Sequence, residues 1–457
     1  MGYGWITLLP AVLVLVVAIL SKKTTESLFF GVFVSYLIIS IADGKNLITL
    51  INDSFFSVIT DYDTIWLIIV CGLFGSLIAL LAKSKGTYAF ARLLGKLCTN
   101  GRRTLLAAWI LGIIVFIDDY MNILTVTTCT RKLCDKHKEP REALAFVVDS
   151  TGAPVCVLLP LSTWAIFFAG VFYDLDCVKA MGYADAMATY IRAIPFMFYA
   201  IVAVVFVPLF IVGVIPKLGA MKKAYERVKE TGDVYSEFSK RFNLDEDDDD
   251  EQSKNSAWDF LLPMISLVTV QLITNDMFVA LVISILLCAI LYIPRKKIGG
   301  GEFCELWVKG FADLFPSLMI IVAALFMRQA SADLMLPEFV INLIQPFMSA
   351  NLFPALAFIT VAGLGFITGS NWGIPAVCAP IILPLGAALD VNLLLVMAAI
   401  VSGGTFCSHA CFYSDATVLT SSACGIDNME HAKTQMPYAL LAAGVSVLLF
   451  LIAGFVF

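Results

Sequence analysis

Two adjacent carboxylates and an amide, Asp118, Asp119 and Asn122, lie inside an otherwise apolar stretch from Leu105 to Val126. Charge is costly at membrane depth, so an acidic pair in such a stretch is a candidate ion-binding site; the alternative is a loop end at the lipid headgroups. Both acids cannot point the same way from one tip, and we assign Asp119 to the ion and Asp118 to a structural role. Asn122 could offer its carbonyl oxygen to sodium, a hard cation, or could cap a helix.

Two later interruptions of apolar sequence also carry a carboxylate. Asp149 begins the run Asp149-Ser150-Thr151-Gly152-Ala153-Pro154, and Asp415 lies in Ser414-Asp415-Ala416-Thr417. A carboxyl group removed from water holds its proton more readily, so protonation can compete with sodium binding. We therefore predict that Asp119, Asp149 and Asp415 carry the coupling ions. Each could instead cap a broken helix, because Asp is a preferred cap residue.

Neutral polar side chains accompany these carboxylates and could coordinate sodium or hydrogen-bond to a small polar solute. They are Ser150, Thr151, Ser162, Thr163, Ser370, Asn371, Ser414 and Thr417. His409 stands in an apolar segment and could titrate near neutral pH, or could fill a hydrogen-bonded packing role. Trp164 and Trp372 could stack on an organic cation, or could simply be packed in the interior.

Two cysteine clusters do not favour a metal site. Cys129 with Cys134, and Cys407 with His409 and Cys411, lack the paired spacing of zinc ligands. The 12 cysteines are scattered through apolar segments, which is typical of small packing residues. We expect no metal and no other cofactor.

The composition is that of a polytopic membrane protein. Of 457 residues, 60% are hydrophobic and 14% are charged, and the mean hydropathy is +0.89. Apolar runs near 20 residues recur, each long enough for a helix to cross a hydrocarbon core of roughly 30 Å. Polar and apolar residues do not alternate along these runs, as they would in the strands of a membrane β-barrel. The first run, Trp5 to Leu20, shows no cleavage signal and is expected to be a retained helix.

Basic residues predict the topology, because they collect in cytoplasmic loops. Lys22 and Lys23 place the end of the first helix inside, and an acidic outer loop follows the second helix. Basic segments flank 105–129 on both sides, so this stretch is predicted to be a re-entrant hairpin with Asp118 to Asn122 at its tip. A broken helix is predicted at 142–172. The flanking basic residues are Lys83, Lys85, Arg92, Lys96, Arg102, Arg103, Arg131, Lys132, Lys136, Lys138 and Arg141.

A charged segment divides the chain into two halves. Residues 1–215 form the first half, and 216–257 are predicted to be a cytoplasmic linker that includes the acidic run Asp245 to Glu251. The second half, 258–457, is predicted to contain a hairpin at 352–388 and a broken helix at 391–424. This gives about ten crossings with both termini outside.

The two halves also resemble each other. Ile68 to Phe74 matches Ile320 to Phe326, 252 residues later (320 minus 68). Further matches near this offset are Phe116-Ile117 with Phe366-Ile367, Ser150 with Ser402, Gly152 with Gly404, and Ser162 with Ser414. The charge pattern gives the two copies opposite orientations, so we predict an inverted repeat. In such folds, substrate and ions bind where interrupted helices meet near the midplane.

These motifs resemble the NhaC family of sodium/proton antiporters. The residues that carry the resemblance are Phe116 to Val126, Asp135 to Lys138, Arg141-Glu142, Asp149 to Cys156, Pro160 to Trp164, Gly369 to Gly373, Ser414 to Thr417 and Thr434 to Ala439. The resemblance implies an ion-coupled transporter with re-entrant hairpins and a tendency to form homodimers. The family also includes members assigned to malate/lactate exchange. At Ser408 the family usually has a carboxylate, so one ion site is altered or lost here.

Together these observations predict an all-helical secondary antiporter of the cell membrane that works by alternating access. Its default activity is sodium/proton exchange, and the alternative is ion-coupled transport of a small organic solute such as an amino acid, amine or carboxylate. A channel would pass current without counterflow, and an enzyme would need a catalytic constellation that the motifs do not supply. The sequence shows no Walker-type phosphate-binding loop, so we do not expect ATP to be the energy source. The expected partners are the lipid bilayer and small ions, joined by such a solute under the alternative, with no nucleic acid.

Overall fold

The computed structural model describes residues 3–457 apart from 22, 87–88, 91–97, 161, 244–255, 275, 345 and 347–348. Every regular element in the described ranges is a helix, which confirms an all-helical polytopic membrane protein. The acidic run Asp245 to Glu251 lies outside the described residues, as do Arg92 and Lys96 of the basic segment.

Apolar helices separated by short polar breaks make up the first half. Its elements are η1 (Gly4–Leu8), α1 (Leu9–Ser21), α2 (Thr24–Asp43), α3 (Leu47–Ile59), α4 (Tyr62–Lys83), α6 (Gly101–Ile114), α7 (Asp119–Lys136), α8 (Arg141–Asp149), α9 (Ala153–Leu158), α10 (Thr163–Tyr173), α11 (Asp176–Lys179), α12 (Ala186–Ala193), η2 (Ile194–Phe196) and α13 (Phe198–Val212). The acidic outer loop of the sequence interpretation contains α3, whose N-cap Asn46 accepts hydrogen bonds from the N–H groups of Ile48 and Thr49.

The linker and the second half continue in the same way. Their elements are α14 (Gly219–Thr231), η3 (Phe238–Phe242), α15 (Trp258–Thr274), α16 (Met277–Tyr292), α17 (Gly300–Asp313), α18 (Phe315–Asp333), α19 (Leu336–Ile344), α20 (Phe353–Thr368), α21 (Gly373–Ala388), α22 (Leu393–Ala410), α23 (Asp415–Cys424) and α24 (Asn428–Val456). The linker is thus partly helical.

Several of these segments are long and apolar enough to cross a membrane. In the described part of the chain, 4 helical segments qualify alone, and up to 7 qualify if each bent helix pair is one span. The 4 are Thr25–Asp43, Thr64–Lys83, Leu393–Cys424 and Asn428–Val456. Shorter apolar helices, including α15, α16, α20 and α21, add to them. The number of crossings derived from the sequence stays a prediction.

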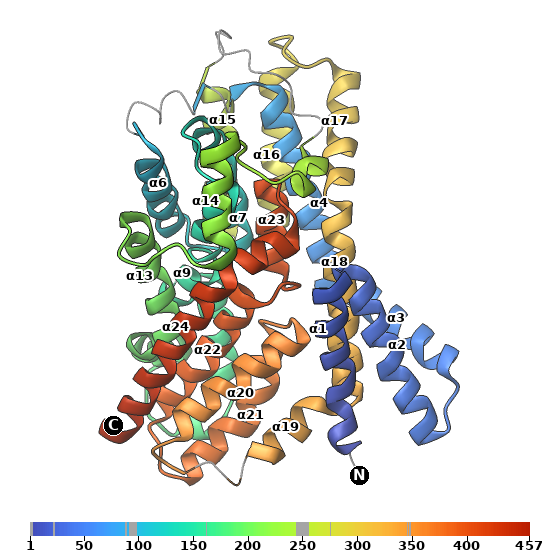
Figure 1. Cartoon of the computed structure of the whole chain (residues 1–457), viewed down its shortest axis with the longest axis vertical. Coiled ribbons are helices and arrows are strands. Elements are labelled where there is room, and N and C mark those ends of the chain that lie inside the picture. Colours follow the sequence, from blue (N-terminus) through green and yellow to red (C-terminus); the bar gives the residue numbers. More distant parts are fainter. Residues whose placement is uncertain are drawn as a thin grey trace.

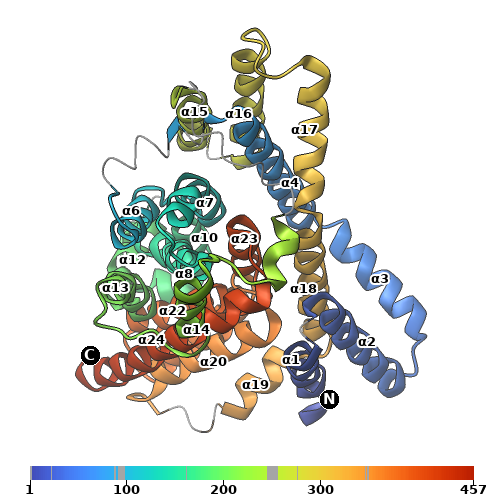
Figure 2. The same cartoon turned by 45° about the horizontal axis from the view of Figure 1, so that its top comes forward.

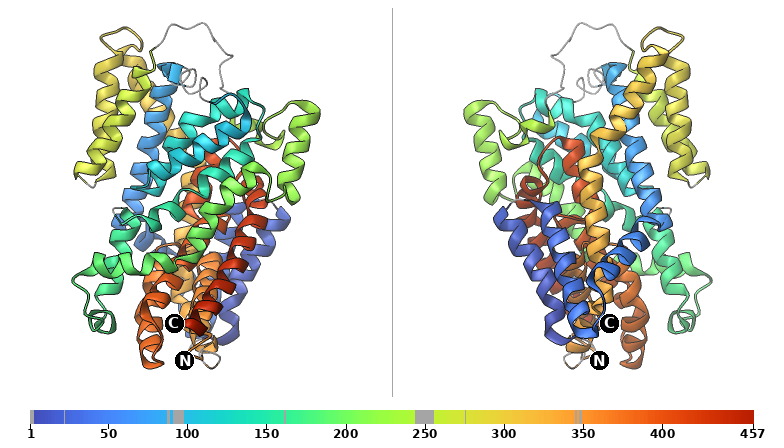
Figure 3. Two further views of the ribbon diagram at one scale, coloured as in Figure 1. Left: turned by 90° about the vertical axis from the view of Figure 1, so that its left-hand side faces the viewer. Right: turned by 90° about the vertical axis from the view of Figure 1, so that its right-hand side faces the viewer.

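The helices gather into two bodies (Figures 1 and 2). One contains α1 to α4 and α16 to α18, and the other contains α6 to α14 and α20 to α24. The two chain ends lie at the same end of the molecule (Figure 3), which is consistent with termini on one side of a membrane. The side itself stays a prediction.

The α6–α7 pair contains the first acidic motif, and its break lies slightly earlier than the predicted tip. α6 ends at Ile114, and Asp118 is the N-cap of α7. Asp119 to Asn122 therefore form the first helical turn instead of an irregular tip. The cause is local, since the Asp118 carboxylate accepts a hydrogen bond from the Met121 N–H at 3.1 Å and so starts the helix at that point.

The two predicted broken helices differ in where they break. In the first half, α8 ends at Asp149, and Gly152 with Pro154 starts α9. In the second half α22 continues through Ser402-Gly403-Gly404 and stops only before Cys411. No proline follows there, because Phe406 stands where the first half has Pro154. Gly403 and Gly404 instead allow close packing, since a β-carbon on either would lie 2.7 Å from Val361 Cβ or from Asn371 O.

Corresponding hydrogen bonds recur in the two halves. Ser162 Oγ donates to Cys156 O at 2.5 Å and accepts from the Ala165 N–H. Ser414 Oγ donates to Ser408 O at 2.7 Å and accepts from the Thr417 N–H. Each of these three positions is shifted by 252 residues, which supports a repeated unit. The opposite orientation of the two copies and the re-entrant path of the hairpins stay predictions.

The linker ties the two halves together at one end. Arg227 of α14 donates to both carboxylate oxygens of Glu142 at 2.8 and 2.9 Å. The buried Arg141 donates to Asn243 Oδ1 at 2.6 Å, and Asn243 donates in turn to Gly425 O at 2.8 Å. The starts of α8 and α24 are therefore held to one strap, which consists of residues 227–243.

Close approach of α4 and α17 generates a stability prediction. A β-carbon on Gly310 would lie 2.7 Å from Ser76 Cα and 2.8 Å from Ala79 Cβ, while Ser76 Oγ donates to Trp307 O at 2.8 Å. Small residues let membrane helices approach in this way. Gly310→Leu should lower stability by about 1–3 kcal/mol through overpacking, seen as a lower midpoint of thermal unfolding in detergent.

The matched control is Gly444→Ala on α24, because, outside the backbone of its own helix, no atom of a described residue lies within 4 Å of the added carbon. It should unfold at the temperature of the unmodified protein. A Gly310→Leu protein as stable as this control would contradict the close packing of α4 and α17.

Candidate functional site

Asp118 has the contacts of a structural residue. Its carboxylate caps α7 and also accepts a hydrogen bond from Thr163 Oγ1 at 3.2 Å. The Thr163 N–H donates to Ile117 O at 2.8 Å. The start of α10 is thus fastened to the break between α6 and α7. These contacts agree with the structural role that we assigned to Asp118.

Asp119, the next residue, is placed very differently. It is 0% exposed, and neither of its carboxylate oxygens has a hydrogen-bond partner in the described structure. The neighbouring charges that act on it are those of Asp118 and Asp415, both acidic. The Trp164 indole lies beside it, and its Nε1 also lacks a partner. An unpaired carboxylate in such surroundings has to be protonated or to hold a cation.

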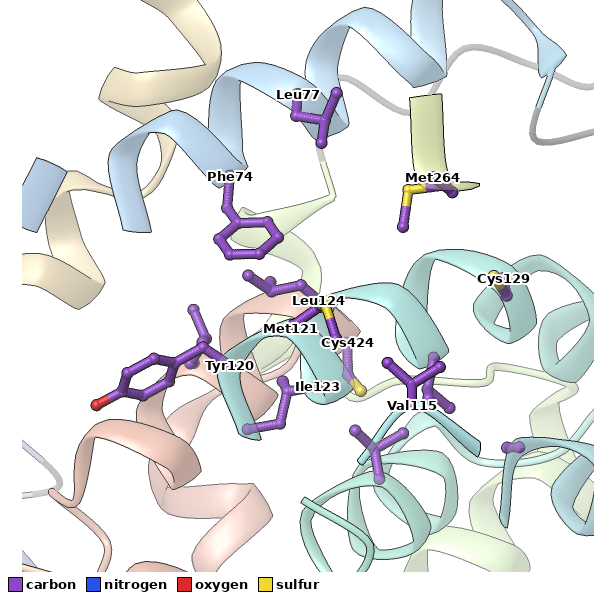
Figure 4. Close-up of a cluster of buried hydrophobic side chains, with 14 of the residues drawn as sticks. Phe74, Leu77, Val115, Tyr120, Met121, Ile123, Leu124, Cys129, Met264 and Cys424 are labelled. Atoms are coloured by element: carbon purple, nitrogen blue, oxygen red, sulfur yellow. The ribbon is translucent and has the colours of Figure 1, made fainter. Parts of the chain in front are cut away.

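Asp415 lies where three elements meet. Its carboxylate accepts hydrogen bonds from Tyr120 Oη of α7 at 2.5 Å and from Asn371 Nδ2 at 2.8 Å. Asn371 belongs to the turn between α20 and α21, and the Ala416 N–H adds a third contact at 2.8 Å. Figure 4 shows Tyr120 extending from α7, away from the apolar residues Phe74 and Leu124 that pack between α4 and α7. Neutral donors thus fix the Asp415 carboxylate.

Asp149 at the end of α8 is the centre of a second buried group. One oxygen, Oδ2, accepts from Gln435 Nε2 at 2.6 Å and from Thr417 Oγ1 at 3.3 Å, and lies 3.0 Å from His431 Nε2. Two further polar atoms of this group, His431 Nδ1 and Gln435 Oε1, are buried without a partner. Ser408 Oγ, on α22, is also buried and unpartnered.

His431 and Gln435 were not among the predicted site residues, although Gln435 lies in the motif Thr434 to Ala439. Both residues lie on α24, which begins at Asn428. The spacing of four residues places both side chains on one face of a helix. Extending the last apolar helix backwards to the Asp427 cap would have revealed them, because Asp427 accepts from the N–H groups of Met429 and Glu430.

His409 uses both ring nitrogens within the protein. Nε2 lies 2.8 Å from Ser150 Oγ, and Nδ1 lies 2.7 Å from Tyr199 Oη. Gln435 also donates to the His409 carbonyl. These contacts fit the packing alternative for His409 and link it to the Asp149 group. Tyr199 of α13 was marked by no sequence motif, and Tyr120 of α7 lies in the Phe116 to Val126 motif but was not predicted to be a site residue.

Asn122 acts mainly as a donor. Its Nδ2 donates to Gly112 O at 2.5 Å, to Val115 O at 2.8 Å and to Thr151 O at 3.1 Å. Asn122 does not cap α7, because Asp118 is the N-cap of that helix. Its amide group instead satisfies carbonyls where α6 and α8 end. Its Oδ1 is buried without a partner, so the oxygen proposed for sodium is not used by another group.

The predicted polar residues thus fall into two neighbouring groups. The Asp415 group contains Asp118, Asp119, Thr163, Asn371 and Asp415, with Tyr120. The Asp149 group contains Asp149, Ser150, His409, Ser414 and Thr417, with His431, Gln435 and Tyr199. The first turn of α23 joins them, since it carries both Asp415 and Thr417.

Three predicted residues have mainly local partners. Thr151 Oγ1 donates to Val147 O at 2.9 Å, Ser162 caps α10, and Ser370 Oγ accepts from the Gly373 N–H at 3.1 Å. In the part of the chain that the structure describes, no group of three or more His, Cys, Asp or Glu side chains could hold a metal ion.

Comparisons with known proteins point to transport. The model of the Na+/H+ antiporter family matches residues 155–455. An uncharacterized protein of Haemophilus influenzae is 25% identical over 486 aligned positions, which cover 99% of this chain and 91% of the relative. The malate-2H+/Na+-lactate antiporter of Bacillus subtilis is 28% identical over 111 residues, 24% of each chain.

A solved structure is also similar, although remotely. The Neisseria gonorrhoeae protein MtrF, described as illuminating a class of antimetabolite efflux pumps, matches with a TM-score of 0.37 and 14% identity. The match covers 89% of this chain and 83% of that one.

The different roles of Asp118 and Asp119 can be tested by comparing the stability of variants at the two positions. Asp118→Ala should lower the free energy of unfolding by about 1 kcal/mol, because the α7 cap is lost, whereas Asp118→Asn should retain the cap. Asp119→Asn should cost less than Asp118→Ala, because it removes no hydrogen bond. Thermal unfolding of the three purified variants measures this, and a larger loss for Asp119→Asn than for Asp118→Ala would refute the assignment.

Proposed function

The chain belongs to the Na+/H+ antiporter family, and from that premise we propose that it exchanges sodium ions for protons across a cell membrane. In this proposal Asp119 is the group that both ions use in turn. The observation that carries it is the isolation of the Asp119 carboxylate, which is fully buried beside the acidic Asp118 and Asp415 and has no hydrogen-bond partner among the residues that the structure describes.

A carboxylate isolated in this way is suited to exchanging a proton for a sodium ion. A buried carboxylate without a counter-charge is stable either as the neutral acid or with a bound cation, and the two forms exclude each other. Each sodium ion that binds then displaces a proton, and each returning proton displaces sodium. Oxygen donors suited to a hard cation lie nearby in the Asp415 group, on α7, α23 and the α20–α21 turn.

Asp149 supplies a second carboxylate that is better compensated. Gln435 and Thr417 donate to its Oδ2, and His431 Nε2 lies 3.0 Å from the same oxygen. In the proposed mechanism the Asp149 group holds the end of α8 against α23 and α24, and it can accept a second ion through the unpartnered oxygens of Ser408 and Gln435. The number of ions exchanged in one cycle would follow from the occupancy of both sites.

The placement of Asp415 between the two bodies supports alternating access. Asp415 belongs to the body with α7 and α23, and α18 of the other body packs against α23. Sliding or rocking of one body against the other would expose this position to each side in turn. The hairpin α20–α21 moves with Asp415 in this scheme, because Asn371 is bonded to it.

A second candidate is ion-coupled exchange of a small organic solute. The Bacillus subtilis relative is named as a malate/lactate antiporter, and Arg328 of α18 brings a cation near Asp415 that sodium/proton exchange does not use. This candidate keeps the ion chemistry at Asp119 and adds a cargo.

Transport in proteoliposomes tests the role of Asp119. With an imposed pH gradient, added sodium should move protons in liposomes that contain the unmodified protein. Asp119→Asn should lower that rate by about tenfold or more, because the amide cannot exchange a proton for sodium. The control is Asp53→Asn on the exposed face of α3, which should transport normally. Unchanged exchange in Asp119→Asn would rule out the proposal.

Competition between the two ions gives a second test. Because sodium and the proton share one carboxylate, the sodium concentration at half-maximal rate should rise as the pH on the sodium side falls, while the maximal rate at saturating sodium changes less. Rates measured over a matrix of sodium concentration and pH decide this. A half-maximal concentration that does not depend on pH would mean separate sites for the two ions.

A further inference from the structure

Three oxygen-bearing side chains follow one another at intervals of three residues along α7, namely Asp119, Asn122 and Thr125. Residues three apart are neighbours on a helix surface, with β-carbons about 5–6 Å apart. Asp119 and Asn122 are 0% exposed, and Thr125 is 8% exposed. In each, at least one side-chain oxygen has no hydrogen-bond partner among the residues that the structure describes. This row of α7 thus holds unused oxygens at three successive positions.

The orientation of Asn122 is fixed by its amide nitrogen. Nδ2 donates to the carbonyl oxygens of Gly112, Val115 and Thr151. Turning the amide over would place Oδ1 against the same three carbonyl oxygens, and an acceptor cannot bond to acceptors. Oδ1 is therefore held away from these carbonyls, and it finds no other partner in the described part of the chain.

Thr125 differs from other threonines of α7. Thr128 and Thr130 donate to the carbonyls of Leu124 and Val126, four residues earlier, at 2.6 and 2.7 Å. A bond of this kind to the helix backbone is a common way to satisfy a hydroxyl inside a helix. Thr125 Oγ1 forms no bond with any described residue. A buried polar group without a partner costs free energy, so its hydroxyl calls for a role in binding.

Thr125 also borders a small cavity at the boundary between the two bodies. Phe74, Leu77 and Leu81 of α4 line the cavity on the side opposite to α7, and Figure 4 shows Phe74 and Leu77 on α4 beside α7. Leu81 lies two residues before Lys83, where α4 ends. The row of oxygens therefore leads from Asp119 to a cavity that lies toward the basic end of these helices.

We propose that Thr125 and Asn122 bind a sodium ion in passage between this cavity and Asp119. The proposal rests on the proposed function, in which Asp119 exchanges sodium for a proton. Asp119 and Thr125 are six residues apart, roughly 9 Å along the helix axis, and Asn122 divides that distance into two steps. Hydroxyl and amide oxygens can replace the water around a hard cation, and the Asp119 carboxylate attracts the ion along the row.

The apolar side chains of α4 close this path in the structure. Phe74, Leu77 and Leu81 belong to the same buried cluster as Leu124 of α7. Because α4 and α7 belong to different bodies, movement of one body against the other would widen or close the cavity while the oxygens of α7 keep their spacing. The path is thus a fixed row of oxygens with a movable apolar cover.

Thr125→Val tests the path in proteoliposomes, because valine lacks the hydroxyl and has a similar size. At low sodium concentration the initial rate of sodium-driven proton movement should fall about threefold or more, whereas Thr125→Ser should retain most of the rate. Thermal unfolding should show Thr125→Val to be at least as stable as the unmodified protein, because the variant removes an unpartnered buried hydroxyl. A merely structural role would lower stability and rate together.

Thr130→Val is the matched control. Thr130 is a buried threonine of the same helix, its hydroxyl already bonds to Val126 O, and it does not line the cavity. This variant should transport at the normal rate. Asn122 is left unchanged, because its amide satisfies three carbonyls. An unchanged rate in Thr125→Val, or an equal loss of rate in Thr130→Val, overturns the proposal.

Counterflow of labelled sodium at equal pH on both sides separates this proposal from the proposed function. If proton movement depends on Asp119 and Thr125→Val transports normally, sodium/proton exchange holds and the path does not. If labelled sodium exchanges without proton movement and Thr125→Val slows that exchange, the path holds and the proposed function fails. If the unmodified protein moves sodium in neither assay, both are overturned.

Discussion

A helix that stops inside a membrane leaves backbone N–H and C=O groups without water, and the protein has to satisfy them internally. The rest of the site depends on this constraint. Asn122 donates to three carbonyls at the ends of α6 and α8, and Tyr413 donates to the carbonyls of Phe366 and Ile367 at the end of α20. Because each break needs polar side chains from another element, the breaks are drawn together near the middle of the molecule.

The buried carboxylates belong to the same arrangement of helix breaks, but they differ in the hydrogen bonds that stabilise them. Asp118 caps a helix, Asp149 is held by several donors, and Asp415 by Tyr120 and Asn371. Asp119 has none of these supports. Burial without compensation is unfavourable for the charged form, and an ion that binds there removes the penalty. The least stabilised acid is therefore the one that we propose exchanges ions.

The polar groups of the site lie close to the boundary between the two bodies. α18 and α4 face α7 and α23, so the boundary between the bodies passes beside Asp415 and Arg328. The strap of residues 227–243 holds the starts of α8 and α24 at one end. Both helices carry members of the Asp149 group, which makes the strap a constraint on how far these helices can separate.

The sequence by itself determined the class of protein and the position of its polar breaks. Hydropathy is a local property, so helices, hairpin partners and the acids at Asp118, Asp119, Asp149 and Asp415 could be located from composition and spacing. The family resemblance, confirmed by comparison, added the antiporter class.

Only the tertiary structure decided which acid is capped and which is isolated, because that depends on partners far along the chain. His431 and Gln435 lie more than 280 positions from Asp149 (431 minus 149 is 282), and Arg328 meets Gly373 only because α18 packs beside the hairpin turn. The sequence also did not show that α22 continues through Ser402 to Gly404, because a glycine can mark either a helix break or a close contact between helices. Packing against α20 shows that these glycines serve a close contact.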